Sequence, residues 1–242
     1  MNASTDREAQ AELVAARKQA AAEAAVALVE NGMAVGLGTG STAFFAVEAL
    51  ARRVRGGLRV RAIATSERTA RQAQGGGITL TSFAECRRLD LTIDGADEIA
   101  RDSLGLIKGL GGALLREKIV AAASARLVII ADSSKLVDRL GTRTSVPVEV
   151  VAFGWETTAA RLDAIGVRPT PRLDAAKQLF RTDGGNLILD CAVGAMDDPA
   201  ALDRKLRQVV GVIETGLFIG MAERAMIGGP DGVRVATRAT AA

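Results

Sequence analysis

The sequence contains no histidine and no tyrosine among its 242 residues. Histidine is the side chain whose ordinary pKa lies closest to neutrality, so acid–base chemistry in this protein must use carboxylates or lysines. The same absence excludes a histidine-ligated metal site and a Ser-His-Asp triad. Enzymes that depend on either arrangement are therefore ruled out.

Cysteine and long apolar runs are also scarce. Cys86 and Cys191 lie far apart in the sequence and form neither a metal-ligand cluster nor a disulfide framework, which fits a reducing compartment. The longest uncharged stretch, residues 31–47, is interrupted by glycines and hydroxyl residues and makes a poor membrane span. The first residues carry acids and no apolar core, unlike a signal peptide. We expect a cytoplasmic protein without membrane association.

The sequence also has no large excess of positive or of negative charge. The 31 basic and 28 acidic residues leave a net charge of +3, which is too balanced to indicate a nucleic-acid partner. The densest basic run, residues 51–61, contains no aromatic residue to stack on a base and is interrupted by Gly56 and Gly57. A solvated helix end that enters a strand explains this run better.

Strands and helices alternate along the first part of the chain, beginning with an Ala-rich helix over residues 5–30. This alternation predicts an α/β fold with a doubly wound, mostly parallel sheet. From Pro147 the order becomes strand, helix, strand, strand, helix, strand, which predicts a smaller ferredoxin-like α+β domain. We assign residues 1–145 and 215–242 to a Rossmann-like catalytic domain and residues 146–214 to the inserted small domain.

Two local expectations follow within and after the small domain. Residues 171–193 are expected to form two strands around the turn at Asp183, Gly184 and Gly185. Residues 212–219, VIETGLFI, are expected to form a single strand.

The loop GLGTGST, residues 36–42, joins a predicted strand to a predicted helix. Glycines allow backbone N–H groups to approach an anion, and the helix start favours negative charge. No lysine follows as in a P-loop, Ser41 replaces the third glycine of a dinucleotide fingerprint, and no acid follows the next strand. The hydroxyls of Thr39, Ser41 and Thr42 suit a small phosphate better. A tight turn with a helix cap remains the alternative.

Three further loops place charged groups where predicted strands end. Asp94 closes the strand LDLTID, Gly95 permits a turn, and Asp97 follows with Glu98. A turn or helix cap would also explain these acids.

The other two loops carry lysines. In IKGLGGALLREK, residues 107–118, Lys108 precedes a second glycine loop and Glu117 lies about one turn into the next helix. Lys135 ends the segment ADSSK, residues 131–135. Glu117 could instead be a solvated helix residue, and a helix N-cap would account for the serines before Lys135.

Parallel strands bring their carboxyl ends to one edge of the sheet, where ligands bind. The four loops would therefore combine an anion cradle, two lysines and several carboxylates. Carboxylate bases without histidine suit proton abstraction next to a carbonyl group.

The motifs GLGTGSTA, TIDGADEI, IKGLGGALLREKIV, DSSK, PVEV and TDGGNLILD occur in this order. With them the chain resembles ribose 5-phosphate isomerases of the A type over residues 15–235. The resemblance implies interconversion of ribose 5-phosphate and ribulose 5-phosphate through an enediolate. It also implies a metal-independent enzyme without a cofactor that forms a homodimer or homotetramer and takes a small sugar phosphate as its partner.

The resemblance also implies site residues. Glu117 would move the proton between C1 and C2, Asp94 would help to open the sugar ring, and Asp97 would contact substrate hydroxyls. Lys108 and Lys135 would steady the enediolate and bind substrate. The implied phosphate contacts are Thr39, Gly40, Ser41 and Thr42, with a looser match at Lys18. The other implied substrate contacts are Gly95, Ala96, Gly109, Leu110 and Gly111, where Leu110 stands in a position that some members fill with glycine and contributes backbone.

Two other functions remain to be weighed. A phosphosugar-sensing domain of a transcription regulator would need a DNA-binding module, and residues 1–30 are too short and too Ala-rich for one. A dinucleotide-dependent oxidoreductase is disfavoured by the missing acid after the second strand.

Overall fold

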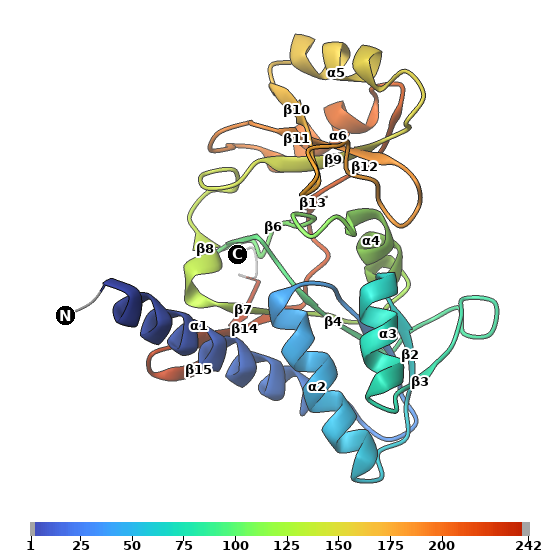
Figure 1. The fold of residues 1–242 in the computed structure, drawn as a ribbon, viewed down its shortest axis with the longest axis vertical. Helices are drawn as coiled ribbons and strands as arrows, with labels where there is room; N and C mark the ends of the chain where they lie inside the picture. The colour runs from blue at the N-terminus through green and yellow to red at the C-terminus, as the bar shows by residue number, and fades with distance from the viewer. Residues whose placement is uncertain (1–2, 239–242) are drawn as a thin grey trace.

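The computed structural model describes residues 3–238, with side chains from residue 8 onward. Its largest sheet has seven strands in the spatial order β15–β14–β7–β4–β1–β2–β3 (Figure 1). In that order the strands are Gly232–Thr237, Arg224–Gly229, Leu127–Asp132, Leu91–Gly95, Ala34–Leu37, Arg61–Ala64 and Thr79–Leu80. All neighbours pair in parallel except β14 and β15. The predicted mostly parallel sheet is therefore confirmed.

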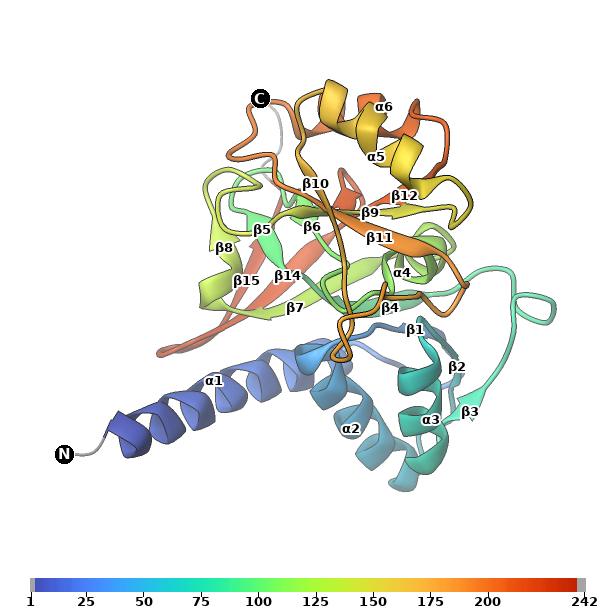
Figure 2. The ribbon, with the colours of Figure 1, turned by 45° about the horizontal axis from the view of Figure 1, so that its top comes forward.

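Helices cover the large sheet on both faces. The helices of this region are α1 (Ala3–Val26), α2 (Ser41–Arg55), α3 (Glu67–Gly75) and α4 (Leu114–Ala122). Figure 2 shows α1 and α2 on one side of the sheet and α4 on the other, toward a second sheet. In the described part of the chain, no helix combines the length and apolar character of a membrane span.

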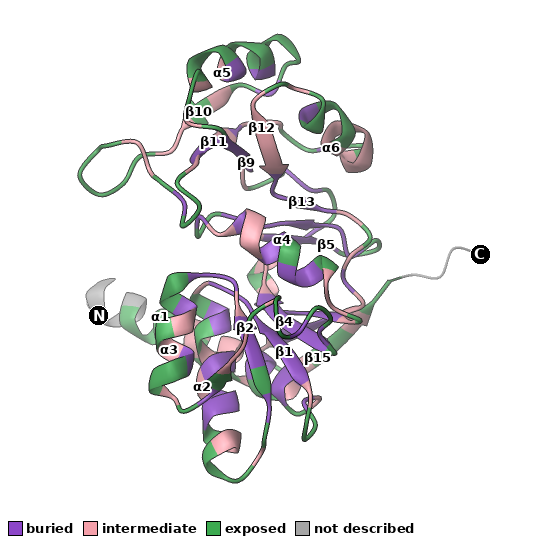
Figure 3. Ribbon diagram, turned by 90° about the vertical axis from the view of Figure 1, so that its right-hand side faces the viewer, coloured by how far each residue is buried: buried purple, intermediate pink, exposed green. Residues whose placement is uncertain are grey.

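The core lies against both faces of the central strand β7, whose residues are all buried. Val128 and Ile130 pack in a cluster with apolar residues of α1 and α2. The intervening Ile129 and Ala131 pack in a cluster on the opposite side. A strand buried on both faces explains why its first five residues, LVIIA, form an unbroken apolar run. Figure 3 shows the nearby strands β1 and β4 in the colour of buried residues as well.

The second sheet is small and antiparallel, with the order β10–β11–β9–β12. These strands are Pro169–Pro171, Leu187–Cys191, Val146–Val150 and Val212–Thr215, and the accompanying helices are α5 (Trp155–Ala164) and α6 (Pro199–Arg207). The predicted order strand, helix, strand, strand, helix, strand is confirmed. The domain boundaries at residues 145 and 215 stay a prediction.

The strand pair predicted for residues 171–193 is wrong in its first half. β10 ends at Pro171, and residues 172–186 form a long loop with only isolated bridges. The Asp174 carboxylate accepts the N–H groups of Ala176 and Gln178, at 2.8 and 2.9 Å. This local turn competes with strand pairing.

A third sheet of short strands was not predicted. It has the order β13–β6–β5–β8, with strands Leu217–Phe218, Leu106–Ile107, Glu98–Ala100 and Leu136–Val137. Residues 212–219, predicted as one strand, divide at Gly216 between the second and third sheets. A Cβ atom on Gly216 would lie 2.3 Å from the carbonyl oxygen of Lys108. The Lys108 N–H donates to Gly216 O at 2.9 Å, and Gly216 therefore fixes the backbone at Lys108.

Candidate active site

The first glycine loop, residues 36–42, connects β1 to α2 and lies directly against β4. A Cβ atom on Gly38 would lie 2.0 Å from Oδ1 of Asp94, so only glycine fits at this position. Gly40 has a φ angle of +127°, a conformation that side-chain-bearing residues rarely adopt. The two glycines bring the beginning of α2 beside the strand that carries Asp94.

The N-terminus of α2 is open toward solvent and suited to an anion. Gly40 is its N-cap and provides no side-chain cap, and no acid lies in the first turn. The first N–H groups of a helix have no partner within the helix and carry a partial positive charge. Lys18 reaches across from α1, and its Nζ donates to Ser41 Oγ at 3.0 Å. N–H groups, a hydroxyl and an ammonium group thus meet at one point.

Thr39 faces inward rather than toward this point. Its Oγ1 lies 2.7, 2.8 and 3.1 Å from the hydroxyl oxygens of Thr65, Ser66 and Thr69. Its N–H donates to Asp94 Oδ1 at 3.2 Å. This hydroxyl cluster ties the first glycine loop to α3. Its three partners, two directly after β2 and one in the first turn of α3, were not predicted as site residues.

Helix α4 presents Glu117 in its first turn and is held in place by the next residue, Lys118. The buried Lys118 Nζ donates to the carbonyl oxygens of Thr215 and Leu217, at 2.6 and 2.8 Å, and to Glu214 Oε1 at 2.9 Å. The sequence offered Lys118 only as the residue that follows Glu117 in the motif of residues 107–118. Its three acceptors instead fasten α4 to the crossing between the second and third sheets.

Lys108, Asp94 and Glu117 form a buried charge cluster. Lys108 Nζ lies 3.0 Å from Asp94 Oδ2 and 3.3 Å from Glu117 Oε2, and it donates to the carbonyl oxygen of Gly95 at 2.6 Å. The exposed fractions of Asp94, Lys108 and Glu117 are 0, 2 and 3%. Glu117 Oε2 accepts no hydrogen bond from the residues that the structure describes. A buried carboxylate oxygen with only a longer ion pair keeps a lone pair available for a ligand.

One ammonium group beside two buried carboxylates shifts the pKa of all three groups. Burial and, to a smaller extent, the charge of Asp94 raise the pKa of Glu117 to about 8, against the lowering effect of Lys108. Burial also raises the pKa of Asp94. Burial alone would lower the pKa of Lys108. The negative charges of Asp94 and Glu117 outweigh this effect and raise the Lys108 pKa above its ordinary value. Lys108 therefore stays charged, and the two acids titrate as a pair.

The second glycine loop, residues 109–112, faces the first across the site. Gly109 and Gly112 have φ angles of +106° and +83°. The N–H of Leu110 donates to Asp97 Oδ2 at 2.9 Å, while the Leu110 side chain is 44% exposed. At this point Leu110 therefore contributes its backbone rather than its side chain. The loop holds Asp97 on the rim of the site.

These loops enclose a single cleft that brings most of the predicted residues together. It is lined by Thr39, Gly40, Ser41, Thr42, Gly95, Ala96, Asp97, Lys108, Gly109, Gly111, Glu117 and Lys135. Three predicted residues are not part of the lining. Asp94 lies beneath Lys108, Leu110 points away, and Lys18 lines a larger, mostly apolar cavity that shares Gly40 and Ser41 with the cleft.

The chain is similar in sequence and in fold to proteins of one known family. The model of the family described as ribose 5-phosphate isomerase A (phosphoriboisomerase A) matches residues 61–232. A ribose-5-phosphate isomerase A of Gloeobacter violaceus is 57% identical over 224 residues, which cover 93% of this chain and 97% of that protein. The protein of the same name from Gluconobacter oxydans is 54% identical over 217 residues, or 89% of this chain and 94% of the relative.

Solved structures agree with this similarity. The ribose 5-phosphate isomerase A of Methanocaldococcus jannaschii superposes with a TM-score of 0.88 at 35% identity, covering 92% of this chain and 98% of that chain. A D-ribose-5-phosphate isomerase solved in complex with phospho-erythronic acid gives a TM-score of 0.89 at 32% identity, covering 93 and 99%. Both similarities extend over nearly the whole chain.

Proposed function

The chain belongs to the ribose 5-phosphate isomerase A family, and from this premise we propose how its own residues interconvert ribose 5-phosphate and ribulose 5-phosphate. It is an aldose–ketose isomerase that acts on a sugar phosphate, as the motifs indicated. One observation carries the proposal. The buried Glu117–Lys108 pair lies in the wall of a cleft whose other wall is the uncapped start of α2.

We assign the phosphate group to the N-terminus of α2. Ser41 and Thr42 offer N–H and hydroxyl donors there, and Gly40 allows a close backbone approach. Lys18 adds a positive charge through its position beside Ser41. Thr39 supports the loop from beneath, because its hydroxyl is engaged with α3.

We assign the proton transfer to Glu117. In the open-chain aldose, Glu117 removes the proton from C2, and the electron pair moves toward the C1 carbonyl to form the enediolate. The protonated Glu117 then returns the proton to C1, while a hydroxyl proton passes from the C2 oxygen to the C1 oxygen. The pKa of Glu117, raised to about 8 by burial, makes it a stronger base than an ordinary carboxylate.

Lys108 stabilises the negative charge that develops on the two oxygens, because it stays protonated and lies next to the base. Asp94 is fully buried beneath Lys108, so it takes part in ring opening and isomerisation through Lys108. Asp97 and Lys135 face the cleft and contact the sugar hydroxyls. The backbone of Gly95, Ala96 and the second glycine loop completes the substrate contacts.

A coupled assay of ketose formation from ribose 5-phosphate tests the function. Pure protein should form ribulose 5-phosphate, and unphosphorylated ribose should lose kcat as well as affinity because phosphate binding energy positions the reacting carbons. Inorganic phosphate should compete weakly. A folded protein that forms no ketose would refute the activity, whereas equal turnover of ribose and its phosphate would refute only the phosphate site.

The alternative of a sensing domain is not favoured, because a sensor needs no buried base at the end of its ligand cleft. We further propose that the enzyme works in the cytoplasm as a homodimer or homotetramer. The free, buried thiols of Cys86 and Cys191 agree with a reducing compartment. Light scattering of the purified protein would give the subunit number.

A further inference from the structure

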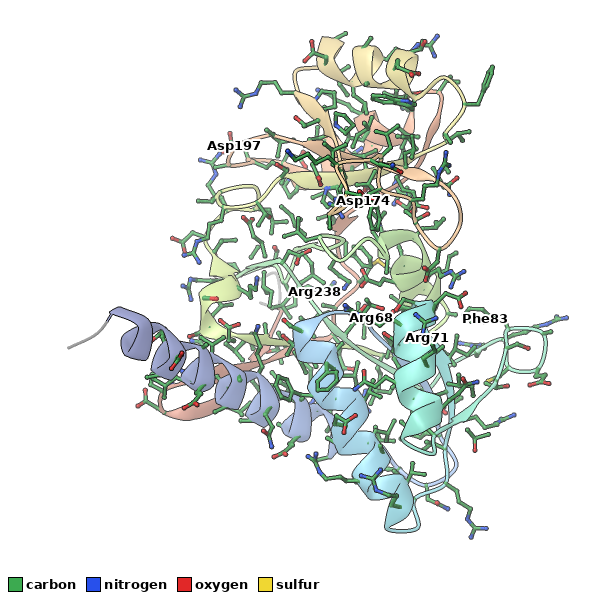
Figure 4. All side chains as sticks on the ribbon, viewed as in Figure 1. Arg68, Arg71, Phe83, Asp174, Asp197 and Arg238 are labelled. Atoms are coloured by element: carbon green, nitrogen blue, oxygen red, sulfur yellow. The ribbon has the colours of Figure 1, made fainter. Side chains whose placement is uncertain are left out.

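The loop of residues 172–186, here called the strap, leaves the small antiparallel sheet and reaches the opposite side of the cleft. Figure 2 shows it as the yellow-orange loop that descends from β10, and Figure 4 labels Asp174 at its first turn. Its far end contacts α3, where the Glu67 N–H donates to Asp183 Oδ2 at 2.8 Å. Arg116 of α4 also pairs with Asp183, at 3.3 Å.

At the beginning of the strap, Arg172 is hydrogen-bonded to the second glycine loop. Its Nη1 donates to the carbonyl oxygens of Gly109 and Leu110, at 2.8 and 3.0 Å. The other side of the guanidinium group pairs with both carboxylate oxygens of Asp190, with Nε 2.9 Å from Oδ2. The Arg172 side chain is 11% exposed. The planar group thus has a carboxylate on one side and two loop carbonyls on the other.

The loop that Arg172 holds is the one that orients Asp97. The peptide unit between Gly109 and Leu110 gives its carbonyl oxygen to Arg172 and its N–H to Asp97 Oδ2, the latter at 2.9 Å. A rotation of this peptide would break both hydrogen bonds together. Asp190, Arg172, the peptide and Asp97 therefore form one continuous series of polar contacts from the small sheet to the cleft.

A second contact from the strap closes over the same loop. Phe180 packs on Gly112 so closely that a Cβ atom there would lie 2.4 Å from the ring. Arg172 lies 5.9 Å from the centroid of the Phe180 ring. The strap therefore fixes the second glycine loop at both of its ends.

We propose that Arg172, oriented by Asp190, is a positioning residue that sets the second glycine loop and thereby aligns Asp97 with the sugar hydroxyls. The inference rests on the role proposed above for Asp97. Arginine is required because its fork can hold a carboxylate and two carbonyls in one plane, whereas a lysine ammonium group acts as a point charge. The sugar-binding wall of the active site thus depends on the small sheet.

Arg172→Lys tests the proposal, with Arg181→Lys as the matched control. Arg181 lies on the same strap, is exposed, and donates to Gly185 within the strap. The measurements are kcat and KM for ribose 5-phosphate, the inhibition constant of inorganic phosphate, and the melting temperature. Asp190→Asn provides a second variant that weakens the orientation of Arg172 without removing it.

Arg172→Lys should lower kcat/KM by about tenfold or more, mainly through KM, because a small displacement of a positioning group is costly. Phosphate inhibition should stay within about twofold of wild type, since α2 and Lys18 do not take part in this series of contacts. Asp190→Asn should change KM in the same direction, and Arg181→Lys should change nothing.

A double-mutant cycle separates positioning from a general structural effect. If Arg172 acts through Asp97, Arg172→Lys should have little further effect on KM in an Asp97→Asn background. Equal losses in both backgrounds, unchanged kinetics of Arg172→Lys, or a parallel weakening of phosphate and substrate would overturn the inference. Failure of the proposed function would instead appear as an inactive wild type and an inactive Arg181→Lys control.

Discussion

Two glutamates with nearly equal burial have opposite surroundings in this molecule. Glu98 of β5 is 1% exposed and Glu117 of α4 is 3% exposed. The Glu98 carboxylate accepts the N–H groups of Gly141, Arg143 and Thr144, at 2.6, 2.6 and 2.8 Å. The Glu117 carboxylate has a 3.3 Å ion pair with Lys108, and its Oε2 accepts no hydrogen bond from the described part of the chain. Glu98 therefore organises a loop, whereas Glu117 retains the capacity to take a proton.

The comparison shows that burial of a carboxylate does not by itself indicate chemistry. Burial of an ionised carboxylate is costly, and backbone N–H groups offset that cost when they donate hydrogen bonds to both of its oxygens. At Glu98 they come from one loop, residues 141–144. At Glu117 the compensation comes from a lysine that also serves Asp94. The incomplete compensation leaves Glu117 with a raised pKa, a feature typical of the residues that carry out chemistry.

The largest contrast is expected in turnover. Glu117→Gln keeps the shape of the side chain but removes the base, so kcat should fall by about 10²–10⁴-fold with little change in KM. Glu98→Gln, its matched control, should keep kcat within about twofold when measured below its unfolding transition. Stopped assays with high enzyme concentration give both values. If Glu117→Gln kept more than about a tenth of the wild-type kcat, the base would have to be Asp94 or Asp97.

The free energy of unfolding should instead be affected by the change at Glu98. The amide of Glu98→Gln turns an N–H donor toward backbone N–H groups and leaves at least one of them without an acceptor. The free energy of unfolding should fall by about 1–3 kcal/mol, the usual cost of an unsatisfied buried group. Urea titration of both variants measures this. A Glu98→Gln protein as stable as wild type would mean that the loop finds other acceptors.

The pH dependence of activity should follow the ionisation of Glu117. The groups that face Glu117 are Lys108, Asp94 and Asp97, and burial raises its pKa to about 8. Because the base must be ionised, kcat/KM should fall by up to about tenfold per pH unit below that value. Titration of a phosphate monoester near pH 6 lies well below this range. An acid limb that begins only near pH 5 would contradict a raised pKa, and the limb should keep its position in Glu98→Gln.

The sequence indicates the role proposed for Glu117 more directly than it indicates the hydrogen bonds of Glu98. Lys108 and Glu117 lie within one contiguous motif beside a glycine loop, and the family resemblance of that motif implied their roles. Spacing alone left a solvated Glu117 as an alternative. Glu98 is part of an equally recognisable acidic segment, but its donors lie more than 40 residues away along the chain. No local pattern encodes such a contact.

The same reason explains which other parts of the fold the sequence predicts and which it does not. The large sheet follows from apolar runs that alternate with helices, and β7 is the clearest example. The third sheet consists of strands of two or three residues, too short for any periodicity to appear. The break at Gly216 and the contacts of Arg172 depend on which segments meet in space. These are consequences of tertiary structure that residue spacing does not carry.

The smallest expected effect concerns the cost of keeping Glu117 ionised. Its pKa is raised from 4.5 in the unfolded chain to about 8 in the folded protein, so its protonation stabilises the fold fully below pH 4.5. That stabilisation is lost as the pH rises through about 8. Glu117→Gln remains neutral and leaves Lys108 paired with Asp94 alone. The variant should therefore match wild type near pH 5.

At pH 9 the same Glu117→Gln variant should be more stable than wild type by about 0.5–2 kcal/mol, the range common for a single stabilising substitution. Urea unfolding at the two pH values measures the difference, and Glu98→Gln should stay less stable than wild type at both. A Glu117→Gln protein less stable than wild type at pH 9 would mean that the ionised carboxylate is a net favourable partner of Lys108. The two glutamates would then differ in their hydrogen bonds but not in their effect on the fold.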